Sequence, residues 1–241
     1  MRRRWSVVTA AGVAVLMAVV VGCYLLANSR TFQLAGVLVN RVDTAEKVVA
    51  LTFDDGPAEH TPEVLDVLAR SGVPATFYLN GADLDRYPEH GAAIARAGHE
   101  IGNHTYTHRR MVLVSPGTVA EEVERTDAAI ARTGYRGAVT FRPPYGKKLW
   151  TLPRYLAERD RITVTWDVEP DSGGSPDTDR IVEDTVDAVQ PGSIILLHVM
   201  FDGRSASRAA VPLIIERLQV DGYRFVTVSD LLQQRDSTEK T

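Results

Sequence analysis

Short runs of β-branched residues alternate with longer segments of helical spacing from residue 48 onward. The short runs predict strands at residues 48–53, 75–79, 100–103, 138–141, 162–166, 193–197 and 224–228. The longer segments predict helices at residues 62–70, 88–97, 119–133, 153–159, 179–189 and 211–220. This alternation indicates an α/β protein with a mostly parallel sheet. Because the units are short, we expect a distorted or incomplete (β/α) barrel.

The N-terminal segment has a different pattern. Arg2, Arg3 and Arg4 precede residues 7–27, which carry no charge. A helix of this length would span roughly 32 Å, enough to cross the hydrocarbon core of a membrane. We therefore expect residues 1–28 to be a cytoplasmic Arg run followed by a single transmembrane helix. The Arg run would keep the N-terminus in the cytoplasm of a bacterial cell and place the rest of the chain outside it.

Two alternatives to an uncleaved anchor remain open. A cleaved signal peptide is one, although no small-x-small cleavage site stands in a suitable place. A lipoprotein signal is the other, because Val20 to Cys23 resembles a lipobox, although residues 24–27 continue the apolar run past Cys23. Beyond the anchor we expect a join at residues 29–46, part of which docks on the domain. The domain itself would cover residues 47–234, followed by a polar tail at 235–241.

Composition excludes several classes of protein. Apolar residues make up 44% and charged residues 24% of the chain, as in an ordinary globular protein. The formal net charge of −4 leaves no basic footprint for nucleic acid. Cys23 is the one cysteine of the sequence, which rules out an internal disulfide and any metal site built from several thiolates. Nothing in the sequence marks an oligomer interface.

Reactive side chains follow the predicted strands where each strand ends. The carboxyl ends of barrel strands meet on one face, where active sites form. Charges with a purely structural role would be scattered over both ends of the barrel and its outer helices. We therefore expect one site that contains Asp54, Asp55, His104, His108, Arg142, Asp167 and His198.

The spacing of two of these residues indicates a metal site. His104 and His108 are four residues apart, so on a helical turn both imidazoles would lie on one face. With one aspartate of the pair Asp54 and Asp55 they make a two-His, one-carboxylate set, which suits a catalytic divalent ion with open positions. The other aspartate would be free to act as a general base. This combination points to metal-assisted hydrolysis of an acyl group, whereas each motif alone is equally compatible with a polar turn or with surface histidines.

Three further residues complete the predicted chemistry. His198 ends an apolar strand and is interpreted as the acid that protonates the leaving group. Arg142 has the forked geometry that orients a carboxylate. Pro143 and Pro144 stiffen the loop after it, so the backbone N–H of Tyr145 could point at a developing oxyanion.

Five segments, taken in order, resemble the motifs of polysaccharide deacetylases with the NodB homology domain (carbohydrate esterase family 4). They are residues 52–57, 98–108, 142–146, 166–171 and 196–198. The resemblance implies a distorted (β/α) barrel, a divalent metal that is commonly zinc, with cobalt, nickel or manganese as alternatives, and hydrolytic removal of acetyl groups from sugars. It also implies a role for each residue: Asp54 as base, Asp55, His104 and His108 as metal ligands, Arg142 as the residue that positions the base, and His198 as acid.

The fourth motif departs from the family pattern. Members often have an Asp-Trp pair there, whose Asp tunes the acid histidine, but here no Trp follows Asp171. Either Asp167 or Asp171 could partner His198, and spacing favours Asp171. Val199 also stands where an acidic residue is common.

These observations predict a membrane-anchored, metal-dependent N-deacetylase. Its partner would be an extracellular N-acetylated glycan, namely peptidoglycan, a chitin-like polymer or an exported polysaccharide. A hydrolase of another C–N amide bond on the same barrel is one alternative. A glycan-binding module that has lost catalysis is another, but the complete set of polar residues argues against it.

Overall fold

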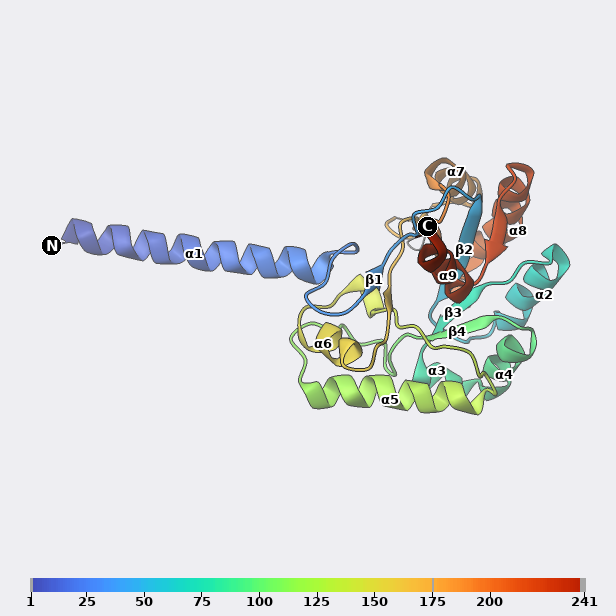
Figure 1. Ribbon diagram of the computed structural model, residues 1–241, viewed down its shortest axis with the longest axis horizontal. Helices are drawn as coiled ribbons and strands as arrows, with labels where there is room; N and C mark the ends of the chain where they lie inside the picture. Colours follow the sequence, from blue (N-terminus) through green and yellow to red (C-terminus); the bar gives the residue numbers. More distant parts are fainter. Residues whose placement is uncertain (1, 175, 239–241) are drawn as a thin grey trace.

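The computed structural model describes residues 2–174 and 176–238. A parallel sheet lies at the centre of the domain (Figure 1). Its strands are β2 (Val48–Asp54), β3 (Thr76–Leu79), β4 (Glu100–Asn103), β6 (Ile194–Leu197) and β7 (Arg224–Val226). They run in the order β4-β3-β2-β6, and β7 also pairs with β2. A second parallel pair joins β1 (Leu38–Val39) to β5 (Thr163–Val164). The expected α/β class with parallel pairing is confirmed.

Isolated bridges connect the two sheets into a distorted barrel. Phe141 bridges to Asn103 at the end of β4 and to Thr163 in β5. Val168, a few residues past β5, bridges to Ile195 in β6. All three bridges are parallel, so hydrogen bonding continues around the barrel through single residues where full strands are missing. For this reason the predicted strand at 138–141 is reduced to a bridge.

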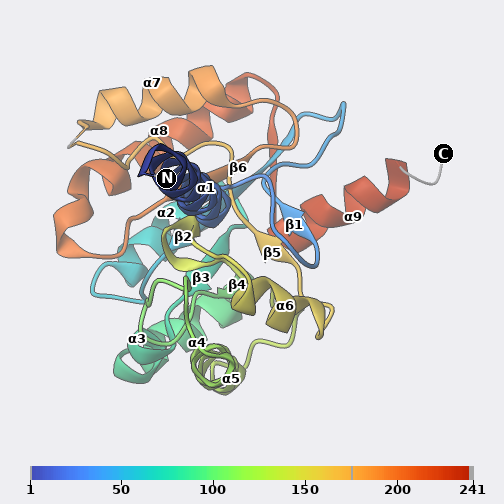
Figure 2. The same ribbon diagram turned by 90° about the vertical axis from the view of Figure 1, so that its left-hand side faces the viewer.

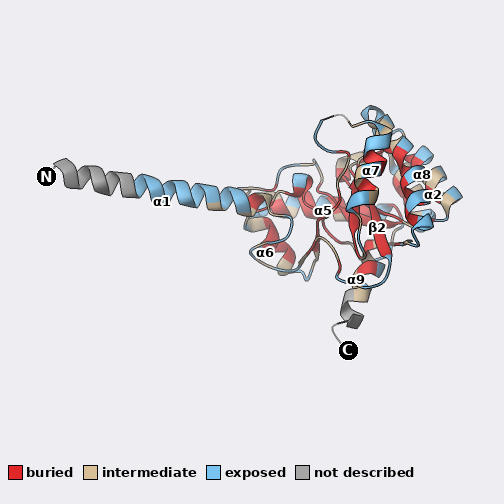
Figure 3. Cartoon of the chain, turned by 90° about the horizontal axis from the view of Figure 1, so that it is seen from above, coloured by how far each residue is buried: buried red, intermediate tan, exposed pale blue. Residues whose placement is uncertain are grey.

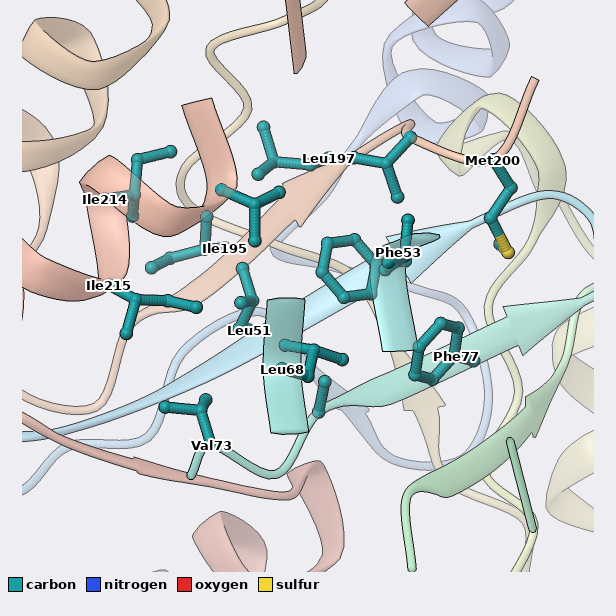
Figure 4. Packing of buried hydrophobic residues seen from close by; sticks show 14 of the residues in the cluster. Leu51, Phe53, Leu68, Val73, Phe77, Ile195, Leu197, Met200, Ile214 and Ile215 are labelled. Carbon is teal, nitrogen blue, oxygen red and sulfur yellow. The ribbon is translucent and has the colours of Figure 1, made fainter. Parts of the chain in front are cut away.

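The alternation of side chains along β2 separates the core from the site. Val49, Leu51 and Phe53 join a large apolar cluster on one face, to which helices α2 (Thr61–Ser71) and α8 (Ser205–Val220) contribute Leu68, Ile214 and Ile215 (Figure 4). The opposite face begins with apolar residues and then turns polar at Thr52 and Asp54. Every residue of β2 is buried, as the burial colouring of Figure 3 also shows. The last residues of β2 therefore carry polar groups into the interior of the barrel.

Helices surround the strands on the outside (Figure 2). The ones that enclose the domain are α2 (Thr61–Ser71), α3 (Gly81–Arg86), α4 (Pro88–Arg96), α5 (Pro116–Arg132), α6 (Thr151–Ala157), α7 (Thr178–Ala188), α8 (Ser205–Val220) and α9 (Val228–Thr238). Pattern analysis missed α3, which is too short to show a period. It also missed α9, which extends through residues 235–238 of the predicted tail, while 239–241 lie outside the described residues.

Helices α5 and α8 begin three or more residues earlier than predicted, for different local reasons. Helix α5 begins at Pro116 because Ser115 caps it, its side chain accepting a hydrogen bond from the N–H of Thr118. Helix α8 begins at Ser205 and contains Pro212 within its length. The predicted start at residue 211 would have placed this proline in the first turn, where proline is normally found.

The N-terminal helix α1 (Arg2–Asn28) projects away from the domain (Figure 1). Many of its described apolar side chains, such as Leu16 and Leu25, are exposed. Within the described residues, however, no helix combines the length and apolar character that a membrane span requires. The predicted transmembrane helix in residues 1–28 is therefore not supported.

The join that follows α1 is built into the barrel. The N–H groups of Thr163 and Thr165 donate to the carbonyls of Val37 and Val39, so this segment extends the barrel beside β5. Further along, the N–H of Val42 donates to the carbonyl of Gly192. Part of residues 29–46 thus docks on the domain, as expected from its apolar content.

Gly192 provides a test of this docking. It has a φ of +81°, and a Cβ there would lie 1.8 Å from the carbonyl oxygen of Val42. We expect Gly192→Ala to lower the free energy of unfolding by about 3 kcal/mol or more, because backbone strain adds to a clash with an immovable backbone atom. Gly98→Ala is the matched control, since Gly98 has the same φ but open space around it; it should cost only about 1 kcal/mol. Urea unfolding of both variants measures the difference, and equal losses would contradict the close approach.

Candidate active site

Two adjacent carboxylates at the end of β2 reach the same point. Neighbouring side chains of a strand point to opposite faces, yet Asp54 Oδ2 lies 3.6 Å and Asp55 Oδ1 3.7 Å from Nε2 of His104. The backbone explains this convergence, because Asp55 has a φ of 69°, in the left-handed region. Asp is one of the few residue types that tolerates this conformation. The turn after β2 therefore brings both acids into one site.

The two histidines come together by a different route from the predicted one. Residues 104–108 form an irregular loop after β4 rather than a helical turn, and His108 has a φ of 56°. The ring centroids of His104 and His108 are nonetheless 5.1 Å apart. His108 Nε2 lies 3.2 Å from Asp55 Oδ1. The loop shape rather than the four-residue spacing brings the rings together.

The arrangement of Asp55, His104 and His108 fits a divalent cation. One ligand atom from each residue lies within 4.8 Å of the other two. Asp55 Oδ1 is buried and has no hydrogen-bond partner among the described residues, as expected of an atom that serves as a metal ligand. Nδ1 of His104 lies 2.7 Å from the carbonyl oxygen of Arg142. That contact places the proton on Nδ1 and leaves the Nε2 lone pair free for a metal.

Burial also favours the neutral imidazole that a metal requires. It lowers the pKa of His104 by more than the nearby carboxylates of Asp54 and Asp55 raise it. The ring is therefore neutral at ordinary pH.

Asp54 is held by a buried arginine. Nη1 of Arg142 donates to Asp54 Oδ1 at 2.7 Å and to Thr52 Oγ1 at 2.8 Å. The guanidinium carbon lies 4.0 Å from the ring centroid of Tyr78, in a cation–π contact. Burial raises the pKa of Asp54. The charges of Arg142, His104 and His198 lower it by more than burial raises it, so the pKa of Asp54 lies below its usual value. The carboxylate is thus ionised.

His198 is paired with Asp171. The backbone N–H of His198 donates to Asp171 Oδ2 at 2.7 Å, and its Nδ1 lies 3.2 Å from Asp171 Oδ1. The hydroxyl of Ser207 on α8 donates to the same Oδ2 at 3.0 Å. Burial lowers the pKa of His198, but Asp171 and then the more distant Asp54 and Asp55 raise it by more.

The register of residues 167–171 against β6 explains why Asp167 does not contact His198. Residues 167–171 run parallel to β6, with Val168 bridged to Ile195. Asp167 therefore lies at the beginning of β6, where it accepts hydrogen bonds from the hydroxyl of Ser193 and the N–H of Ile194, both at 2.8 Å. Asp171 is four residues further along and reaches His198 at the end of that strand. Of the two aspartates left open by the sequence, the structure brings only Asp171 to the histidine.

Tyr145 lies at the rim of the site. It occupies a short 3-10 turn (Pro144–Gly146) with a φ of 59°, and it is 53% exposed. Its ring centroid is 4.7 Å from that of His108. The side chain thus borders the metal-ligand set, while the predicted role of its backbone N–H stays a prediction.

Comparison with known proteins identifies the family. The polysaccharide deacetylase model matches residues 41–173. The chain belongs to the polysaccharide deacetylase family. The expectation that it is a carbon–nitrogen amide hydrolase of the polysaccharide N-deacetylase type is confirmed at this level.

Relatives and solved structures agree with this assignment. A peptidoglycan-N-acetylglucosamine deacetylase of Bacillus cereus is 35% identical over 187 residues, covering 77% of this chain and 68% of the relative. A chitooligosaccharide deacetylase of Rhizobium leguminosarum bv. phaseoli is 39% identical over 160 residues, covering 64% and 69%. A crystal structure of a peptidoglycan N-acetylglucosamine deacetylase with a bound N-oxidanyl-benzamide compound gives a TM-score of 0.76 at 32% identity, covering 80% of this chain and 92% of the other.

Several supporting residues of this family member were missed from the sequence. The carboxylate of Glu122 on α5 accepts hydrogen bonds from the N–H groups of Tyr106 and Thr107, both at 2.8 Å, and so fixes the loop between the two histidines. Its signal was present, because Glu122 is a charged residue on the apolar face of a predicted helix. Thr52 gave a similar signal as a polar residue in an apolar strand.

Proposed function

We propose that this protein is a metal-dependent N-deacetylase of an extracytoplasmic N-acetylated glycan, with peptidoglycan as the favoured substrate. One observation carries the proposal. The ionised carboxylate of Asp54 is paired with the buried Arg142. It lies beside a separate set of three residues, Asp55, His104 and His108, that is able to hold a cation. The names of the Bacillus cereus relative and the similar crystal structure support peptidoglycan. The Rhizobium relative supports chito-oligosaccharides as an assayable substitute.

Asp55, His104 and His108 would hold the ion, which we propose to be zinc, with cobalt, nickel or manganese as alternatives. When bound, such an ion supplies a Lewis acid that polarises a carbonyl oxygen and makes water more acidic. Asp54 would take a proton from the attacking water, because its carboxylate is ionised and close to the ligand set. Arg142 keeps that carboxylate oriented. The N–H of Tyr145 would donate to the oxyanion.

His198 would protonate the leaving amine. Asp171 and the charges behind it raise the pKa of His198, so its ring keeps a proton to higher pH than a free imidazole would. Two contacts from Asp171, one to the backbone and one to Nδ1, also fix the direction of the ring. Base and acid thus come from different strands, β2 and β6, which are neighbours in the sheet.

We further propose that the domain acts outside the cytoplasmic membrane of a bacterium. The location of peptidoglycan, the polymer for which the Bacillus cereus relative is named, supports this placement. Protease treatment of intact spheroplasts that make the full chain should digest the domain. Complete protection, with digestion only after lysis, would contradict an external location.

Acetate release tests the proposed activity and its base. Purified protein with zinc or cobalt should release acetate from chito-oligosaccharides or from peptidoglycan strands. Asp54→Asn should reduce kcat about 10²–10⁴-fold, because a general base is lost, while it still binds Co²⁺. Asp55→Asn should lose Co²⁺ binding as well, measured by the absorption spectrum of the bound ion. No release by folded wild-type protein with any metal would refute the activity, and full activity of Asp54→Asn would refute the base.

The dependence of kcat on pH tests the acid. A general acid works only while protonated, so activity is lost as the pH rises through the pKa of His198. Because Asp171 raises this pKa, Asp171→Asn should lower it and move the alkaline limb of the profile to lower pH. Asp167→Asn is the matched control and should leave the limb in place, since Asp167 contacts Ser193 and Ile194 instead. Equal shifts in both variants would contradict the pairing.

A further inference from the structure

A hollow of about 540 Å³ lies beside the candidate active site. The C-terminal half of α1 forms one wall, with Val20 and Tyr24, and the loop after His108 forms another, with Val112. These walls are mostly apolar, but Arg110 and Lys147 also line the hollow. Among the described residues that line it, none is acidic. A hollow of this size can accept a sugar with its substituents.

A cation–π contact and a tilted ring contact connect the hollow to the metal-ligand set. The guanidinium carbon of Arg110 lies 4.7 Å from the ring centroid of Tyr145. The ring of Tyr145 in turn lies 4.7 Å from that of His108. Arg110 is therefore separated from a candidate metal ligand by one aromatic ring. A glycan whose acetamide lies at the metal set would extend a neighbouring substituent toward Arg110.

The positive charge of this hollow has no acidic partner. Many surface arginines of this chain are paired, such as Arg132 with Asp85 and Arg161 with Asp127. In the described part of the chain, Arg110 makes no ion pair and instead lies over the ring of Tyr145. The ammonium group of Lys147 donates to a neutral acceptor, Oδ1 of Asn28. Two cations thus face one hollow in a chain whose net charge is −4.

We propose that this hollow is a substrate subsite that selects a glycan carrying a carboxylate beside the sugar that is deacetylated. The planar guanidinium of Arg110 can donate two parallel hydrogen bonds to a carboxylate. Its contact with the ring of Tyr145 orients the guanidinium before the substrate binds. The apolar walls suit the methyl groups that flank such a carboxylate or an acetamide. This inference rests on the proposed function, and it names the residue, Arg110, through which an anionic glycan such as peptidoglycan would be preferred to a neutral one.

Three substrates and two variants test the subsite. The substrates are peptide-free peptidoglycan strands, the same strands with their carboxylates reduced to alcohols, and neutral chito-oligosaccharides. Wild-type protein should show a kcat/KM about tenfold higher on the carboxylate strands than on the reduced ones, because a charge-assisted fork is lost on reduction. Arg110→Gln should abolish this preference, mainly through KM. Arg109→Gln is the matched control, an exposed neighbour outside the hollow, and should keep the preference.

The outcomes separate this inference from the proposed function. If Arg110→Gln keeps the preference, or if both variants lose it equally, the subsite is refuted while deacetylation stands. If wild-type protein releases no acetate from any of the three, deacetylation is refuted and calorimetric binding of the strands decides the subsite. Tighter binding of the carboxylate strands by wild-type than by Arg110→Gln supports it, and equal dissociation constants overturn it. The difference in dissociation constant between wild type and Arg110→Gln should shrink as the salt concentration rises, because the pair of Arg110 and the substrate carboxylate is open to solvent.

Discussion

One fully buried charge organises the site. The side chain of Arg142 is inaccessible to solvent, so its desolvation must be offset by a partner in good geometry. Asp54 supplies the opposite charge, Thr52 and the carbonyl of Thr165 supply acceptors, and Tyr78 covers one face of the guanidinium. The backbone carbonyl of Arg142 accepts a hydrogen bond from Nδ1 of His104. Arg142 therefore fixes the proposed base through its side chain and a metal-ligand candidate through its main chain.

The elements that carry the site could be predicted because they are buried and short. The strands that lead to Asp54 and His198 are mostly apolar runs, which parallel pairing produces when both faces are covered, whereas the strand before His104 is less apolar but equally buried. The end of each run marks the carboxyl edge of the sheet. Pattern alone was thus sufficient to bring these residues to one face of the barrel.

What could not be predicted depends on backbone geometry that composition does not encode. Spacing favoured Asp171 over Asp167 and the contact with His198 agrees with it, but the choice depends on register along β6, and a single sequence has no record of which residue lies opposite which. The two histidines were expected on a helical turn, but left-handed residues at Thr105 and His108 give the loop another shape. The pattern at residues 138–141 predicted a strand, whereas the backbone there contributes only isolated bridges at Phe141.

The left-handed backbone at three positions of the site has a consequence for how this protein can change. Asp55, His108 and Tyr145 all have positive φ values, each of which costs the native state free energy. A glycine at any of them would relax the chain while removing a side chain of the candidate site. Selection for stability alone would therefore favour a site without these side chains.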